Sequence, residues 1–236
     1  MAHWPRAAGR YPAAGNAVKS ADASMREYYA ARAPIYDEVY LRPERQADLD
    51  ELRRRLPSWF AGRAVLEIAC GTGWWTQFIA PLAAHLTATD AVAEPLAFAR
   101  LRPGVERVSF VQADAFALPE SLGTFDAAFA GLWISHVPVE RRREFLAGLH
   151  ARLALGSRVV LVDNTEAQCE RLPIAGRDAA GNTYQRRGLP DGTMHRVLKN
   201  FPAEAELRSM IDGIGAMPQY WRGGHFWAFS YATAFV

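Results

Sequence analysis

The sequence predicts an α/β protein built on a doubly wound parallel sheet with helices on both faces. Five short strand-like runs alternate with helical patterns between positions 65 and 163, which is the rhythm of βαβ units. The first run, Val65–Ile68, is followed by Gly71 and Gly73 and then by an amphipathic helical pattern. Two glycines at this spacing allow the backbone to lie directly against a ligand. A strand, a glycine turn and a helix in this order indicate a nucleotide site.

The first helix of the core is expected before this strand. Residues Glu44–Phe60 carry leucines at helical spacing, namely Leu49, Leu52 and Leu56. Pro57 is expected to end the helix, because proline cannot donate the backbone hydrogen bond that a helix interior needs.

The remaining elements of the sheet follow in regular alternation. Further strands are expected where apolar or alternating runs occur, at His85–Thr89, Arg107–Ala113, Phe125–Leu132 and Arg158–Asp163. Helices are expected where the apolar spacing is helical, at Trp75–Ala83, Val92–Leu101 and Glu140–Leu155. Gly156 indicates where the last of these helices ends, since glycine is common directly after helices.

The last third of the chain breaks this alternation. Thr165–Thr193 is rich in Gly, Pro, Arg and Asn without a clear period, and it is too long for an ordinary connection. A short strand is expected at His195–Asn200 and a helix at Phe201–Ile214. Two closing strands, Gln219–Trp221 and Phe226–Thr233, are joined through a Gly-Gly pair.

Composition excludes several classes of protein. With 236 residues, half of them hydrophobic, the chain can bury one large core, and a formal charge of +2 is too balanced to indicate nucleic acid. No apolar run approaches the roughly 18 residues of a membrane span. Cys70 and Cys169 lack metal-ligand spacing, so we expect free thiols, no metal site and a reducing, cytoplasmic location.

The beginning of the chain differs from the rest in composition. Residues 1–23 are rich in Ala, Gly, Pro and Arg, without periodicity and without the apolar core of a signal peptide. We therefore expect a disordered leader over 1–23 and a single domain over 24–236.

The segment Glu67-x-Ala69-x-Gly71-x-Gly73 resembles motif I of the class I S-adenosylmethionine-dependent methyltransferases. It differs from the motif at Ala69, which stands where the family has its first glycine. The resemblance covers about residues 44–233 and implies a Rossmann-like sheet of seven strands with the last one antiparallel. It also implies S-adenosyl-L-methionine (SAM) as cofactor, S-adenosyl-L-homocysteine (SAH) as product, and a substrate-side insertion over 165–200.

Two acids end strands in the register of this family's adenosine site. By the resemblance, Asp90 accepts hydrogen bonds from the ribose hydroxyls and Asp114 from the adenine amino group, with a helix cap or turn as the alternative for each. Glu67 would contact the methionine amino group, directly or through water, with bonding to loop amides as its alternative. The expected cofactor contacts are Tyr28, Tyr36, Glu67, Ala69, Gly71, Gly73, Trp75, Asp90, Ala91, Asp114, Ala115, Phe116 and Leu132.

His136 is the candidate catalytic residue. It follows the fourth expected strand, at the edge where open α/β sheets bind their ligands. An imidazole of ordinary pKa, near ~6.5, can take the proton that a nitrogen or oxygen nucleophile sheds. The alternative is a histidine that only packs in its loop. The residues expected to contact the substrate are Tyr29, Trp133, Tyr184 and Trp221.

The aromatic segment Met25–Tyr40 resembles the N-terminal lid segment of similar enzymes. Such a lid would exclude water and strengthen the electrostatics around the sulfonium. The alternative is that Tyr28, Tyr29 and Tyr36 only anchor the first helix to the domain.

The function that these features favour is SAM-dependent methyl transfer to a nitrogen or oxygen of a small, planar or aromatic molecule. Nucleic acid and membranes are not expected partners, and the protein is expected to be a monomer or homodimer. A non-catalytic SAM-binding module is one alternative, and the bulky residues around Gly73 disfavour a nicotinamide-dependent oxidoreductase. A methyltransferase acting on protein or RNA is the other alternative, supported only by Arg171, Arg177, Arg186 and Arg187.

Overall fold

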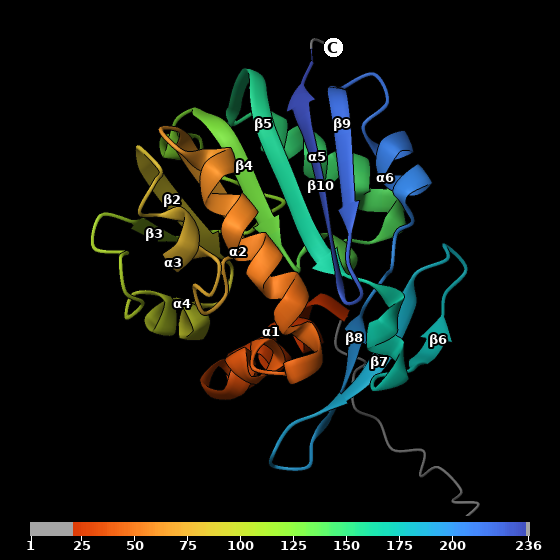
Figure 1. Cartoon of the computed structure of the whole chain (residues 1–236). Helices are drawn as coiled ribbons and strands as arrows, with labels where there is room; N and C mark the ends of the chain where they lie inside the picture. The colour runs from red at the N-terminus through yellow and green to blue at the C-terminus, as the bar shows by residue number, and fades with distance from the viewer. Residues whose placement is uncertain (1–20, 235–236) are drawn as a thin grey trace, which may run out of the picture.

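The computed structural model describes residues 21–234. The centre of this part is a seven-stranded sheet in the order β3-β2-β1-β4-β5-β10-β9 (Figure 1). Its strands are β1 Ala64–Ile68, β2 His85–Asp90, β3 Ser109–Gln112, β4 Phe125–Gly131, β5 Leu153–Asn164, β9 Gly215–Arg222 and β10 Phe226–Thr233. Neighbours from β3 to β5 run parallel, whereas β10 is antiparallel to both β5 and β9. This confirms the predicted doubly wound sheet with an antiparallel last strand.

Helices cover both faces of the sheet (Figure 1). Those of one face are α2 Gln46–Phe60, α3 Thr76–Ile79 and α4 Ala93–Ala99, and those of the other are α5 Arg142–His150 and α6 Glu204–Met210. Within β5, Val160 and Val162 belong to the core under α2, whereas Val159 and Leu161 belong to the core under α5. Because successive side chains of a strand point to opposite faces, a strand covered on both sides needs a continuous apolar run.

Several predicted element ends differ from the structure by a few residues, and two of the differences have a clear physical reason. α2 continues through Pro57 to Phe60. The complete burial of Leu56 and Phe60 outweighs the one hydrogen bond that Pro57 cannot donate. β5 begins at Leu153, where the sequence predicts a helix, and its pairing with β4 shifts register next to Gly156, whose φ is +74°.

The insertion after β5 forms a second, antiparallel sheet in the order β6-β7-β8. Its strands are β6 Ile174–Arg177, β7 Thr183–Gly188 and β8 Met194–Leu198. The sequence predicts only the last of them, because polar residues and arginines interrupt any alternation in the first two. The small sheet lies beside the carboxyl ends of the parallel strands (Figure 1).

The N-terminal segment lies at the same edge (Figure 1). It consists of α1 Ala21–Arg32 and η1 Ala33–Tyr40, and Met25 and Tyr28 of α1 pack against Val197 of β8. α1 already includes residues 21–23 of the leader that is predicted over 1–23. The first 20 residues of this leader lie outside the described part of the chain.

The connections contain several short helices. These 3₁₀ helices are η2 Pro43–Arg45, η3 Glu120–Leu122, η4 Ile134–His136, η5 Val139–Arg141 and η6 Glu166–Glu170. Within residues 21–234, no helix combines the length and apolar character needed to cross a membrane. Cys70 and Cys169 are both free thiols.

Gly73 lets α4 approach the glycine turn. Its φ of +73° is in the left-handed region, and a Cβ built on it would lie 2.9 Å from both Cα and Cβ of Ala99. Gly71 also has a positive φ, +56°, but a Cβ there would meet nothing within 4 Å. Both positions need a residue that tolerates a positive φ. At Gly73 the close packing of Ala99 also excludes a side chain, whereas at Gly71 there is space for one.

We predict that Gly73→Ala lowers the free energy of unfolding by about 2–4 kcal/mol, through left-handed strain and overpacking together. Gly71→Ala is the matched control and should lose only the conformational part, about 1–2 kcal/mol. Urea titration followed by circular dichroism measures both variants. Equal losses would contradict the packing role of Gly73.

Candidate functional site

A first cavity lies at the carboxyl ends of the parallel strands, beneath α1. The sheet edge contributes Ala69, Asp90, Ala91, Val92, Pro95, Ala113, Asp114, Ala115, Phe116, Gly131, Leu132, Trp133 and His136. The covering N-terminal segment contributes Met25, Arg26, Tyr29 and Tyr36. Parallel strands end at the same edge of a sheet, so residues far apart in the sequence meet here.

The backbone is strained where two strands reach this cavity. Ala69 after β1 and Leu132 after β4 have φ values of +51° and +58°, which residues with a Cβ seldom adopt. Ala69 stands where the family that the sequence resembles has a glycine, and its φ explains that preference. Strain of this kind concentrates at ligand sites, where it orients backbone groups toward the ligand.

Asp90 closes the glycine turn. Its Oδ2 accepts a hydrogen bond from the Gly71 amide at 2.9 Å, and its Oδ1 accepts one from the Val92 amide at 2.8 Å. The second bond is the capping alternative, and it coexists with a place in the cavity wall. Each carboxylate oxygen has two lone pairs, so both can still accept a ribose hydroxyl.

Asp114 joins the lid segment to the sheet. Its Oδ1 accepts a hydrogen bond from the Phe116 amide at 2.9 Å, and its Oδ2 forms an ion pair with Nη2 of Arg26 at 2.6 Å. Both side chains of this pair are partly exposed at the cavity rim. Arg26 therefore joins α1 to the rim of the cavity, a contact that the sequence did not indicate.

Glu67 is buried beneath the same turn, with 1% of its surface exposed. Its Oε2 has no hydrogen-bond partner among residues 21–234, so the loop amides do not satisfy this atom. Burial raises the pKa of Glu67 to about 8, and the negative charge of Asp90 acts in the same direction. The carboxyl group of Glu67 is therefore mostly protonated at neutral pH, and a cationic neighbour would favour its charged form.

His136 has a defined tautomer. Its Nδ1 lies 2.5 Å from the carbonyl oxygen of Leu198, which can only accept, so Nδ1 carries the proton. Its Nε2 lies 2.9 Å from the Tyr29 hydroxyl and accepts that hydrogen bond. Burial, followed by the charges of Lys199 and Arg187, lowers the pKa of His136 well below its ordinary value. The imidazole is therefore neutral at pH 7.

A second cavity adjoins the first, between the N-terminal segment, the end of β5 and the small sheet. Four residues line both cavities, namely Tyr29, Tyr36, Leu132 and His136. The rest of its wall is mainly polar and includes Tyr28, Arg32, Arg42, Arg45, Asn164, Gln168, Arg171, Arg187 and Lys199. The two cavities form one site with two compartments, which meet at the Tyr29–His136 hydrogen bond.

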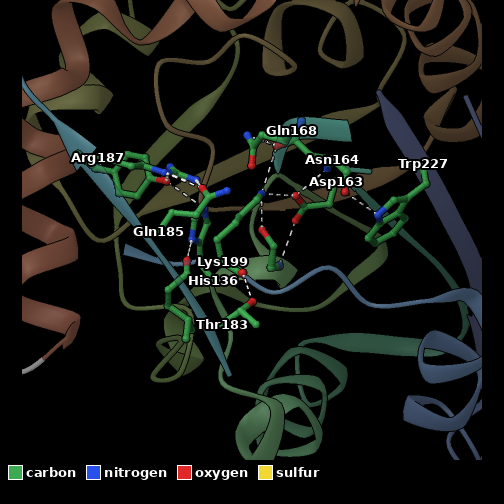
Figure 2. Close-up of polar contacts among 12 residues, drawn as sticks. His136, Asp163, Asn164, Gln168, Thr183, Gln185, Arg187, Lys199 and Trp227 are labelled. Atoms are coloured by element: carbon green, nitrogen blue, oxygen red, sulfur yellow. Dashed lines mark hydrogen bonds and ion pairs between the residues drawn. The ribbon is translucent and has the colours of Figure 1, made fainter. Parts of the chain in front are cut away.

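Lys199 supports the wall of the second cavity. Its Nζ donates hydrogen bonds to Asp163 Oδ1 and Ser135 Oγ, both at 2.7 Å, and to Asn164 Oδ1 at 3.2 Å (Figure 2). The side chains of Lys199 and Asp163 are 1% and 0% exposed. Because Ser135 precedes His136 in η4, this network also holds the imidazole in place.

Most of the predicted site residues meet at the two cavities. Those in the wall of the first are Tyr29, Tyr36, Ala69, Asp90, Ala91, Asp114, Ala115, Phe116, Leu132, Trp133 and His136. Tyr28 is in the wall of the second. Glu67, Gly71 and Gly73 lie behind the first wall and shape the turn that Asp90 closes.

Three predicted aromatic contacts lie outside both cavity walls. Trp75 packs edge-to-face against Tyr40 and Phe129 in the core. The Tyr184 hydroxyl donates a hydrogen bond to Asp178, and Trp221 packs beneath the guanidinium of Arg55. Residue type alone does not reveal which aromatic side chains face a cavity.

Several polar residues of the site were not identified from the sequence as members of a small-molecule site. They are Arg26, Arg32, Arg42, Arg45, Arg187 and Lys199. The sequence carries no signal that Lys199 is buried, because a lysine after a strand is ordinarily exposed. In the described part of the chain, no three His, Cys, Asp or Glu side chains are grouped to hold a metal ion.

Comparison with known proteins gives consistent similarities. A family model described as a methyltransferase domain matches residues 65–156. The ubiquinone biosynthesis O-methyltransferase of Xanthomonas axonopodis pv. citri (strain 306) is 31% identical over 159 residues, which cover 66% of this chain and 63% of that protein. The matched part of this chain thus spans less than two thirds of that relative's length.

Two solved structures match nearly the whole chain. The DhpI–SAH complex is 30% identical with a TM-score of 0.75, and the match covers 90% of this chain and 96% of that one. The DhpI–SAM–HEP complex is 31% identical with a TM-score of 0.73, and the match covers 91% and 99%. These two structures are complexes with SAH and with SAM, the product and the cofactor that the resemblance of the glycine turn implies.

We predict that Asp90→Ala weakens SAH binding at least about tenfold, because charge-assisted hydrogen bonds to the ribose contribute about 1.5–3 kcal/mol each. Isothermal titration calorimetry measures the dissociation constant. Asp50→Ala, an exposed acid on α2, is the control and should bind as the wild type does. An unchanged dissociation constant in Asp90→Ala would show that Asp90 is only a cap.

We predict that the free energy of unfolding of the wild type, measured relative to that of Glu67→Gln, falls as pH rises from about 5 to 8. The folded protein keeps the proton of Glu67 until pH 8, whereas the unfolded chain loses it near the ordinary value of 4.5, so rising pH favours unfolding in this window. The slope contributed is at most about 1.4 kcal/mol per pH unit. Urea titrations at several pH values measure this difference, in which the contributions of the histidines cancel. Glu120→Gln, which alters an exposed acid, should differ from Glu67→Gln in the same way as the wild type does.

Proposed function

The chain belongs to the class I S-adenosylmethionine-dependent methyltransferases, and from this we propose that it methylates an oxygen of a small molecule held in the second cavity. Membership of the family makes it an enzyme with SAM as cofactor and SAH as product. When bound, SAM supplies an electrophilic methyl group on a sulfonium. The chain's own residues contribute a place for the acceptor and a route for its proton.

The observation that carries the proposal is the junction of the two cavities. Asp90 and Asp114 would hold the adenosine end of the cofactor in the first cavity, and the second cavity begins beyond Tyr29 and His136. Displacement of a methyl group requires that nucleophile, methyl and sulfur be aligned. An acceptor in the second cavity would reach the methyl group at this junction.

An oxygen acceptor is supported by the name of the curated relative, which is an O-methyltransferase, and by the chemistry of the junction. Tyr29 donates its hydroxyl proton to His136 Nε2 and accepts a hydrogen bond from Arg187 Nη1 at 3.0 Å. Burial raises the pKa of Tyr29, so the hydroxyl stays protonated at rest. As the acceptor oxygen attacks, its proton would pass to Tyr29 while the proton of Tyr29 passes to His136. The products are the methylated oxygen, SAH and an imidazolium.

The distribution of arginines supports a small acceptor over protein or RNA. Arg171 and Arg187, two of the four arginines that suggested a macromolecule, line the second cavity. Arg187 is buried against Tyr29 and Arg171 pairs with Glu44, which leaves Arg177 and Arg186 as the exposed members of this set without an ion pair within residues 21–234. Two such arginines are few for a track that binds a phosphate backbone. A planar or aromatic acceptor was expected partly from Tyr184 and Trp221, and the proposal does not depend on it because both lie outside the cavity walls.

We predict that His136→Ala lowers kcat about 10²–10⁴-fold, with SAH affinity nearly unchanged, because it removes the proton acceptor but no cofactor contact. Tyr29→Phe should lower kcat to a similar degree, since it keeps the ring and breaks the relay. A screen of small hydroxyl compounds for SAH production identifies an acceptor, and steady-state kinetics then compare the variants.

His150→Ala is the matched control, because this histidine lies on α5 outside both cavities and hydrogen-bonds Tyr231. It should keep the wild-type turnover. If His136→Ala stays within a few-fold of the wild type at saturating acceptor, His136 is not the base, and the acceptor arrives already deprotonated.

We also predict a pH profile unlike that of an ordinary histidine. An unperturbed imidazole, as assumed from the sequence, would make kcat fall below pH ~6.5. The structure corrects this expectation, because burial and two cations lower the pKa of His136 well below that value. kcat should therefore stay constant through pH 6.5 and fall only in more acidic solution. If the kcat of the wild type falls with a midpoint at pH 6.5, and the kcat of Tyr29→Phe does not, the buried relay is contradicted.

A further inference from the structure

The wall of the second cavity carries cations without matching anions. It contains Arg32, Arg42, Arg45, Arg171, Arg187 and Lys199 and, among the described residues, no aspartate or glutamate. Lys199 pairs with Asp163, and Arg171 pairs with Glu44. The other four arginines form no ion pair within residues 21–234. The cavity is therefore a region of net positive charge.

Arg187 is the clearest case of a buried cation without a counter-ion. It is 8% exposed, and its hydrogen bonds go to neutral groups, the Tyr29 hydroxyl at 3.0 Å and Gln185 Oε1 at 2.8 and 3.2 Å (Figure 2). Arg45 is 5% exposed, and its Nη1 donates to the carbonyl oxygen of Val39. A buried charge is costly unless it is paired, so two of them in one wall indicate that an anion completes the site.

The cations of this wall are also close enough to affect one another. Burial, and after it the charge of Arg171, lowers the pKa of Arg42. Burial, and after it the charge of Arg42, lowers the pKa of Arg45. Like charges held together in one cavity raise the local concentration of anions, and they attract a doubly charged anion more strongly than a singly charged one.

We propose that the second cavity binds an oxyanion group of the acceptor, with Arg187 and Arg45 as its main partners. The planar fork of donors on a guanidinium matches the oxygens of carboxylate and phosphate groups. Four arginines without ion pairs favour two negative charges over one, so a phosphate-type group is expected to bind more tightly than a carboxylate. The proposal rests on the proposed function, because it assigns the class of acceptor to the same site.

The charge of the cofactor leads to the same class of acceptor. The sulfonium of SAM is positive and would face the junction at Tyr29 and His136, next to the arginine-lined wall. An ammonium group in the second cavity would bring a further positive charge into a buried region, whereas an oxyanion offsets the charges already there. Amines are therefore disfavoured as acceptors.

A bound oxyanion also acts on His136. The groups that face the imidazole are the Tyr29 hydroxyl from α1, Arg187 from β7, and the Leu198 carbonyl with Lys199 at the end of β8. Arg187 and Lys199 are the positive members of this set, and an anion on Arg187 offsets one of them. The imidazole then takes up a proton more readily, so the acceptor itself helps to activate the base.

Calorimetry with inorganic phosphate tests the proposal on the full chain saturated with SAH. We expect phosphate to bind to the SAH complex and acetate to bind more weakly. Arg187→Met should weaken phosphate binding at least about tenfold, because it removes charge-assisted hydrogen bonds. Arg186→Met alters the exposed neighbour on β7 and is the matched control, with an expected change of less than about twofold.

Phosphate affinity unchanged in Arg187→Met, or no phosphate binding to a wild type that binds SAH normally, would overturn the oxyanion site. Acetate bound more tightly than phosphate would overturn the preference for two charges. If Arg187→Met does not fold, Arg42→Gln tests the same wall from its partly exposed side, with an expected loss of about threefold. If the protein methylates neutral alcohols but does not bind phosphate, the oxyanion site is contradicted and the proposed function stands. If the protein binds phosphate but methylates no acceptor, the proposed function is contradicted.

Discussion

The buried ion pair between Lys199 and Asp163 determines how the two sheets meet, and the second cavity depends on it. Asp163 lies near the end of β5 in the main sheet, and Lys199 directly follows β8 of the small sheet. The same carboxylate accepts a hydrogen bond from the Ser135 amide at 3.0 Å, which brings η4 and His136 to this point. Burying two charges adds little net stability, but breaking such a pair is costly. The pair therefore selects one arrangement of the cavity walls over others.

Charge is divided between the two compartments of the site. Asp90 and Asp114 lie in the wall of the first, with Glu67 beneath it, whereas arginines dominate the wall of the second. A cationic cofactor in the first compartment and an anionic acceptor in the second would each meet the opposite charge. This distribution of charge favours binding of each reactant in its own compartment. The same helix, α1, closes both compartments through Arg26 and Tyr29. A cover of this kind would limit the access of water to both compartments and strengthen the electrostatic contacts inside.

Much of the fold and half of the site could be predicted from the sequence, because their signals are local. The apolar runs of β1, β4 and β5 and the glycine turn are written in consecutive residues, and Asp90 is recognisable as a strand end. His136 is found in the same way, from its place after β4. Predictions failed where packing outweighs a local rule. Proline usually ends a helix, but α2 continues past Pro57 because Phe60 of the same helix is buried in the core.

The α/β class, the glycine turn and the candidate base can be predicted from the amino-acid sequence, since each follows from spacing along one short segment. Which side chains of the insertion enter the site depends on tertiary packing. Arg186 and Arg187 are neighbours in β7, yet one is exposed and the other is buried against Tyr29. A shift of one residue in strand register reverses this choice, and polar strands carry no apolar alternation that would reveal the register. The second cavity and its charge therefore depend on contacts between segments distant in the sequence.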